Sequence, residues 1–130
     1  MIYAVEGQAP FQQRAQTHIA TLEAAGHRFL ISDLTRAECL VHPLGTGDGN
    51  LLLDYQRFFL SRSLSVKSLT PSIYDRAARI RGQYRYTRGR IYGLVDSLHL
   101  AAAIEYGCER LVTNDERLDN FPEFAVEILP

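Results

Sequence analysis

Two acidic residues, Asp96 and Asp115, have the residue type and sequence context of a carboxylate site. Asp96 precedes a strongly apolar run, residues 98–104, with the composition of a buried helix. Gly107 stands where that helix would end, and residues 110–113 are typical of a strand in a parallel sheet. Asp115 then follows the carboxyl end of this strand, where ligands bind in open parallel sheets. The spacing predicts both carboxylates at the same end of one α/β unit.

A third acid, Glu38, has a comparable position earlier in the chain. It lies in the first turn of a helix predicted to begin at Thr35, after a buried strand at residues 28–32. Thr35 and Glu38 fit a capping box, but Glu38 can equally point toward the carboxyl edge of the sheet as a ligand. Asp96 and Asp115 likewise fit either N-caps or ligands, and the two roles are compatible.

The chemistry that these acids favour is the binding of a hard cation. Carboxylates without a set of cysteine and histidine ligands select Mg²⁺ or Mn²⁺, and the four histidines show no zinc-ligand spacing. Cys39 and Cys108 form no CxxC pair, so we expect both to be reduced, small core residues. Our hypothesis is that Glu38, Asp96 and Asp115 form the cluster that binds the cation.

Residues next to Asp115 are candidates for supporting roles. Thr113 and Asn114 could orient its carboxylate or a water molecule. Asp119 is one helical turn beyond Asp115 in a predicted helix over residues 116–119, and could face the same way as a metal ligand. The alternative for Asp119 is a solvated surface acid.

Arginine is concentrated just before this acidic region. Residues 75–90 contain six arginines and one acid, whereas residues 105–130 contain seven acids and two arginines. Arginines with tyrosines nearby suit single-stranded RNA, through phosphate contacts and base stacking. The candidate RNA-binding residues are Arg79, Arg85, Arg88 and Arg90, with Tyr84, Tyr86 and Tyr92 beside them. The alternatives are a solvated helix face with internally paired arginines, or a surface for an acid-rich partner.

The length of 130 residues fits one domain, residues 1–130, with alternating helices and strands. The helix that carries Glu38 is expected to stop at Pro43. The other expected helices span residues 9–25 and 50–61, and one more begins at Thr70 and Pro71. Strands are expected over residues 64–69 and 125–129. There is no signal peptide or apolar run near 18 residues, so we expect a cytoplasmic protein that does not enter the membrane.

The order of these motifs resembles the PIN-domain ribonucleases, the toxin half of VapBC toxin–antitoxin pairs. The resemblance rests on LVDSLHLAAAIEYGCERLVTND near the end, ISDLTRAECL in the middle, LTPSIYDRAARIR between them and IYAVEG near the start. It covers nearly the whole chain.

The resemblance implies a PIN-like α/β/α sandwich, in which helices flank a central parallel sheet and a helical hairpin protrudes. It also implies a metal-dependent endoribonuclease that uses Mg²⁺ or Mn²⁺ to cleave RNA, with Glu38, Asp96 and Asp115 as catalytic ligands. The implied partners are a VapB-type antitoxin and a second copy of the chain in a homodimer.

The start of the sequence departs from the family pattern. Family members usually begin with a strand reading roughly L-D-T-N-V-L that carries the first catalytic Asp, and this sequence begins after that position. We therefore expect a PIN-like domain lacking the usual first strand, either because the gene start was assigned too late or because the member is degenerate. The alternative function is a catalytically impaired PIN-like module that binds RNA or protein.

Overall fold

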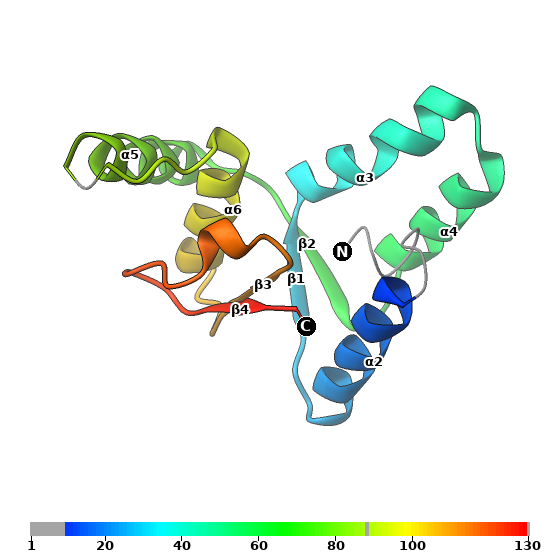
Figure 1. Cartoon of the computed structure of the whole chain (residues 1–130). Coiled ribbons are helices and arrows are strands. Elements are labelled where there is room, and N and C mark those ends of the chain that lie inside the picture. Colours follow the sequence, from blue (N-terminus) through cyan, green and yellow to red (C-terminus); the bar gives the residue numbers. More distant parts are fainter. Residues whose placement is uncertain (1–9, 88, 130) are drawn as a thin grey trace. The chain divides into compact units, whose positions relative to one another are not determined.

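The computed structural model describes residues 10–87 and 89–129 (Figure 1). The chain divides into two compact units, Met1–Ser68 and Leu69–Pro130, which we describe separately. Each unit combines helices with a pair of parallel strands, so the predicted α/β class with parallel strands is confirmed. That residues 1–130 form a single domain stays a prediction. The IYAVEG motif and the question of the first strand fall outside the described residues.

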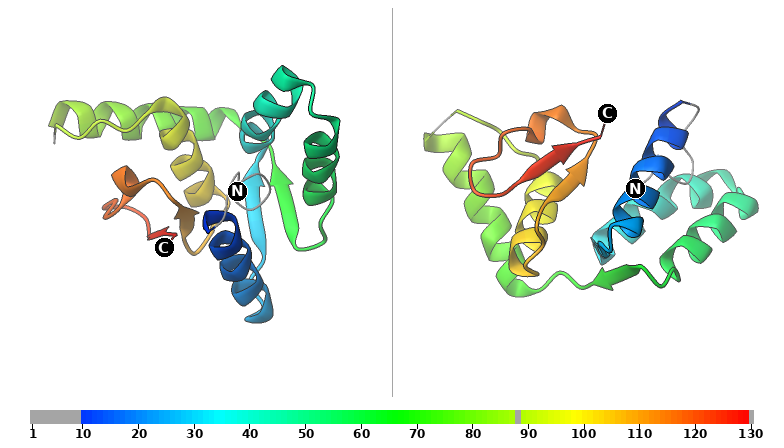
Figure 2. Two further views of the ribbon diagram at one scale, coloured as in Figure 1. Left: turned by 45° about the vertical axis from the view of Figure 1, so that its right-hand side comes forward. Right: turned by 90° about the horizontal axis from the view of Figure 1, so that it is seen from below.

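In the described part of the first unit, residues 10–68, the chain forms three helices and two strands. The strands pair in parallel, with Phe29 opposite Leu64, so the chain crosses between them through two helices. These helices, α3 and α4, lie side by side and form the predicted helical hairpin (Figures 1 and 2). The elements are α2 (Phe11–Ala24), β1 (Phe29–Ser32), α3 (Asp33–Thr46), α4 (Gly49–Phe59) and β2 (Leu64–Lys67).

Helix α3 has different ends from those predicted. It begins at Asp33 with Ser32 as its N-cap, so the predicted capping box is wrong: Thr35 lies inside the helix and Glu38 in its second turn. The helix also continues through Pro43, because the proline ring is buried and this burial offsets part of the lost hydrogen bond. It ends where Gly47 adopts φ 71°, a conformation that glycine allows at low cost.

The core of the first unit joins the strands to the helical hairpin. Ile31, Cys39, Tyr55 and Phe59 form one buried cluster, and the rings of Tyr55 and Phe59 stack with centroids 6.0 Å apart. Cys39 is completely buried, as predicted for a small core residue. The cysteines form no disulfide within the described part of the chain. Burial raises the pKa of the half-buried Cys108 thiol in the second unit.

The described residues of the second unit form a helix pair, a second parallel strand pair and a short 3₁₀-helix. Helices α5 and α6 pack against each other, and β3 pairs with β4 so that Leu111 lies opposite Val126. Figure 2 shows these two strands side by side. The elements are α5 (Pro71–Thr87), α6 (Leu94–Glu105), β3 (Leu111–Thr113), the 3₁₀-helix η1 (Glu116–Leu118) and β4 (Val126–Ile128).

Local capping chemistry explains most helix ends in this unit. Thr70 accepts a hydrogen bond from the backbone N–H of Ile73 at 3.3 Å, which confirms it as the cap of α5. Gly107 follows the end of α6 with φ 66°, as predicted. Asp115 is confirmed as the cap of η1, but Asp96 is not a cap, because α6 begins two residues before it with Gly93 at the N-cap.

A partly exposed ion pair ties α5 to α6. The Nε of Arg76 donates to the carboxylate of Glu105 at 2.6 Å, and the Ser72 hydroxyl donates to the same oxygen at 3.3 Å. The hydrogen bond from Arg76 is the main reason that the pKa of Glu105 lies below its ordinary value.

We predict that Glu105→Gln lowers the melting temperature at pH 7 but hardly changes it in acid. Since the folded-state pKa is lowered, the ion pair stabilises the protein above the ordinary Glu pKa of about 4.3. This stabilisation is lost as the pH falls through the lowered folded-state pKa. Thermal melts between pH 7 and pH 2.5 would measure the difference, with Glu116→Gln at an exposed position of η1 as a control. A difference between parent and Glu105→Gln that is constant with pH would contradict this assignment.

Candidate functional site

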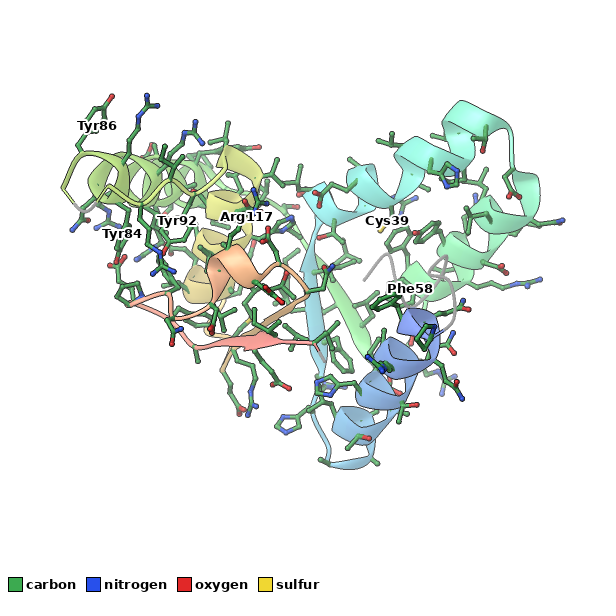
Figure 3. All side chains as sticks on the ribbon, in the orientation of Figure 1. Cys39, Phe58, Tyr84, Tyr86, Tyr92 and Arg117 are labelled. Atoms are coloured by element: carbon green, nitrogen blue, oxygen red, sulfur yellow. The ribbon has the colours of Figure 1, made fainter. Side chains whose placement is uncertain are left out.

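The two acids of the second unit meet at a single arginine. The Nη2 atom of Arg117 hydrogen-bonds Oδ2 of Asp115 and lies 3.7 Å from Oδ2 of Asp96. Figure 3 shows Arg117 on η1, beside the first turn of α6. Asp96 and Asp115 therefore lie close together, as their sequence positions predicted.

Asp96 owes its position to the glycine that precedes α6. A Cβ atom added to Gly93 would lie only 2.8 Å from Oδ2 of Asp96, which is closer than real Cβ contacts. The φ of Gly93 is −59°, a value open to any residue, so its backbone conformation does not require glycine. The absence of a side chain at Gly93 thus makes room for the Asp96 carboxylate.

Asp115 is held on both sides by backbone hydrogen bonds. Its own N–H donates to the hydroxyl of Thr113 at 3.2 Å, and its Oδ1 accepts from the N–H of Arg117 at 2.9 Å. Thr113 therefore contacts the main chain of Asp115. The neighbouring Asn114 is exposed.

Arg117 dominates the electrostatics of the site. Its Nε donates to both carboxylate oxygens of Asp115, at 2.9 and 3.0 Å. These hydrogen bonds lower the pKa of Asp115 despite the opposing effect of burial, and the two acids raise the pKa of Arg117. The side chains of Asp96 and Asp115 are 23% and 24% exposed, whereas that of Arg117 is 76% exposed. The two aspartate side chains are thus largely covered, while most of the Arg117 side chain is exposed.

The other acids predicted as ligands are Glu38 and Asp119. Glu38 belongs to α3 of the first unit, where it is half-buried. Asp119 is not one α-helical turn beyond Asp115, because η1 is a 3₁₀-helix that ends at Leu118. Its carboxylate instead accepts hydrogen bonds from the backbone and side chain of Asn120, at 2.9 and 2.8 Å. Metal binding by either acid stays a prediction.

The donor chemistry of the Asp96–Asp115 pair suits a hard cation. Within residues 69–87 and 89–129 taken alone, no three His, Cys, Asp or Glu side chains gather as a metal-binding set. The two carboxylates nevertheless converge on one positive group, the guanidinium of Arg117. Two oxygen donors that already share a cation fit the preference of Mg²⁺ and Mn²⁺ for carboxylate ligands.

Two of the tyrosines predicted beside the arginines belong to the core. Tyr84, Tyr92 and Phe121 are buried, with ring centroids 5.3–5.4 Å apart. The prediction that Tyr84 and Tyr92 offer faces to RNA bases is therefore wrong, because their rings pack on one another. Tyr86 is exposed, and the guanidinium of Arg85 lies 5.6 Å from its ring centroid.

The arginines of this segment differ in whether they hydrogen-bond within the fold or are exposed to solvent. Arg90 donates to the backbone carbonyls of Asp119 and Asn120 at 2.8 and 3.4 Å, so it holds the turn after η1. Arg79 and Arg85 are exposed on α5, and Arg88 falls outside the described residues. RNA binding by the four arginines stays a prediction.

Sequence reasoning missed Arg117 and Gly93. The signal for Arg117 is its spacing two residues after Asp115, at the start of a short helix. The signal for Gly93 is its position three residues before Asp96. Neither spacing is specific enough to show a contact without coordinates.

The chain matches one protein family by sequence and one solved structure by fold. A protein-family model described as PIN domain matches residues 9–124. None of the curated proteins compared with the sequence matches it significantly. A chain in the crystal structure of VapBC2 from Rickettsia felis, bound to a DNA fragment from their promoter, has a similar fold. The TM-score is 0.76 at 18% identity, and the match covers 99% of this chain and 92% of that chain.

Across residues 10–87 and 89–129, every helix is too short or too polar to span a membrane.

We predict that Gly93→Ala displaces the carboxylate of Asp96 while the protein stays folded. The new methyl group would meet the end of a side chain, which can rotate away from Arg117. Gly82→Ala is the matched control, because a Cβ there meets nothing within 4 Å and alanine stabilises a helix interior by about 1 kcal/mol. Crystal structures of both variants would decide, and an unchanged Asp96–Arg117 distance in Gly93→Ala would contradict the prediction.

Proposed function

The chain belongs to the PIN-domain family, and from this premise we propose that it is a metal-dependent endoribonuclease toxin of the VapC type. The observation that carries the proposal is the convergence of Asp96 and Asp115 on one cationic group. The proposed reaction is hydrolysis of RNA phosphodiester bonds.

The proposed ligands of the catalytic cation are Glu38, Asp96 and Asp115. Their carboxylates suit Mg²⁺ or Mn²⁺, which take oxygen donors. When bound, such an ion would polarise the scissile phosphate and lower the pKa of a coordinated water. Gly93 leaves room for the Asp96 carboxylate, and hydrogen bonds to the main chain hold Asp115 in place.

The proposed substrate contacts lie on α5 and the segment after it. Arg79 and Arg85 are exposed, and Arg85 lies over the exposed ring of Tyr86. A guanidinium and an aromatic ring together can contact a phosphate and stack with an unpaired base. Arg88 and Arg90 remain candidates in the same proposal.

The proposed protein partners are a VapB-type antitoxin and a second copy of the chain. The structural neighbour is described as VapBC2, and its fold resembles that of this chain over 99% of the length. The helical hairpin α3–α4 supports a partner surface, because it exposes the apolar side chains of Val41, Leu44 and Leu53. Exposed apolar side chains grouped on one feature are typical of interaction sites.

Cleavage of RNA is the direct test of the proposed activity. We expect the full chain to cleave a mixture of single-stranded RNA and transfer RNA with Mn²⁺, and to lose cleavage with EDTA. We expect Asp96→Asn and Asp115→Asn each to reduce the rate by about 100-fold or more, since loss of a ligand should exceed the cost of losing an outer contact. Asp54→Asn, which removes an exposed carboxylate of α4, should cleave normally.

The outcomes separate the two candidate functions. Cleavage that survives EDTA, or that survives in both aspartate variants, would contradict the proposal. RNA binding without cleavage by the parent chain would favour the catalytically impaired binding module instead.

We also predict that Leu44→Ser weakens self-association. Leu44 is 63% exposed in the hairpin, so a polar replacement would remove apolar area from the proposed dimer surface without disturbing the core. Leu60→Ser, at an 83% exposed leucine just beyond α4, is the control. Light scattering over a range of concentrations would measure the dimer fraction. A monomeric parent, or equal loss of dimer in both variants, would argue against a hairpin interface.

A further inference from the structure

We propose that Arg117 is a built-in competitor of the divalent cation. Its guanidinium holds Asp96 and Asp115 together in the metal-free protein and leaves them when the metal binds. This inference rests on the proposed metal site, and it assigns to Arg117 a positioning role rather than a catalytic one.

The guanidinium of Arg117 occupies carboxylate oxygens that a metal ion would need. Both oxygens of Asp115 accept hydrogen bonds from the Arg117 side chain, and Oδ1 also accepts from the Arg117 backbone N–H. Oδ2 of Asp96 faces the same guanidinium at 3.7 Å. A hard cation needs lone pairs of these same oxygens as ligands. The guanidinium and the metal therefore compete for Asp115 and for the space between the two acids.

The negative charges of Asp96 and Asp115 favour either positive group, the guanidinium or the metal ion. Two partly covered carboxylates at one place repel each other and favour the approach of a positive group. Arg117 offsets this repulsion in the metal-free chain, because its planar guanidinium matches the geometry of a carboxylate. A divalent ion would replace one positive charge by two, which gives it an advantage over the guanidinium at sufficient concentration.

The Arg117 side chain can move away from the two aspartates while the site stays folded. Its side chain is 76% exposed, so it can turn into water, whereas the side chains of Asp96 and Asp115 are only 23% and 24% exposed with the arginine in place. The backbone N–H of Arg117 and the hydroxyl of Thr113 still hold Asp115 after the guanidinium departs. Asp115 thus keeps its position while the metal ion replaces the guanidinium at its carboxylate.

The test is a Mn²⁺ titration followed by electron paramagnetic resonance on the full chain. We compare the parent with Arg117→Gln, which removes the charge, and Arg117→Lys, which keeps the charge but loses the bidentate geometry. We expect Arg117→Gln to bind Mn²⁺ about tenfold more tightly than the parent, and Arg117→Lys to fall between them. Arg57→Gln, at an exposed arginine paired with Asp54 on α4, should bind like the parent.

Thermal melts supply a readout that does not depend on catalysis. Without metal, Arg117→Gln should melt below the parent, because the two carboxylates lose their shared cation. Saturating Mn²⁺ should raise its melting temperature by more than that of the parent, since no internal group has to be displaced.

The outcomes distinguish this inference from the metal site on which it rests. Equal or weaker Mn²⁺ binding by Arg117→Gln would overturn the competitor role and leave the site standing. Tighter binding by both Arg117→Gln and Arg57→Gln would also overturn it, because the cause would be total charge. No Mn²⁺ binding by the parent or by any variant would overturn the inference and the proposed site together.

Discussion

The site in the second unit depends on holding the carboxylates of Asp96 and Asp115 close together, although their like charges repel each other. Asp96 and Asp115 come from the start of α6 and from the end of β3, and Arg117 lies against both. The local structure accommodates this pair. Gly93 leaves room for the Asp96 carboxylate, and Asp115 is held because its N–H donates to the Thr113 hydroxyl and its Oδ1 accepts from the N–H of Arg117. The aspartate pair therefore lies at the ends of regular elements, Asp96 in the first turn of α6 and Asp115 at the N-cap of η1.

The arginines of the second unit have several distinct tasks. Arg76 joins α5 to α6 through Glu105, and Arg90 binds the carbonyl groups that follow η1. These two are engaged within the fold, so the basic appearance of the segment overstates the positive surface open to a nucleic acid. Of the four arginines predicted to bind RNA, Arg79 and Arg85 are exposed on α5, and their contact with RNA stays a prediction.

Local sequence rules worked where one residue had the right chemistry and no rival stood nearby. Thr70, Gly107 and Asp115 end or begin elements as their types predicted, because each satisfies backbone groups within three residues of itself or permits φ near +66°. The rules failed at Thr35 and Asp96. There the helices begin two residues earlier, and short-range capping preference did not determine which of several neighbouring residues starts the helix.

The sequence by itself predicted the α/β class with parallel strands and the proximity of Asp96 to Asp115, because hydrophobic periodicity indicates the elements and an α/β unit brings the start of its helix and the carboxyl end of its strand to one edge. Only the tertiary structure decided that Tyr84 and Tyr92 pack into a core, that Gly93 makes room for a carboxylate, and that Arg117 stands between the acids. These features depend on side-chain directions and distances in space. The same local sequence pattern is compatible with side chains exposed to water or packed against each other, and the tertiary packing determines which of the two occurs.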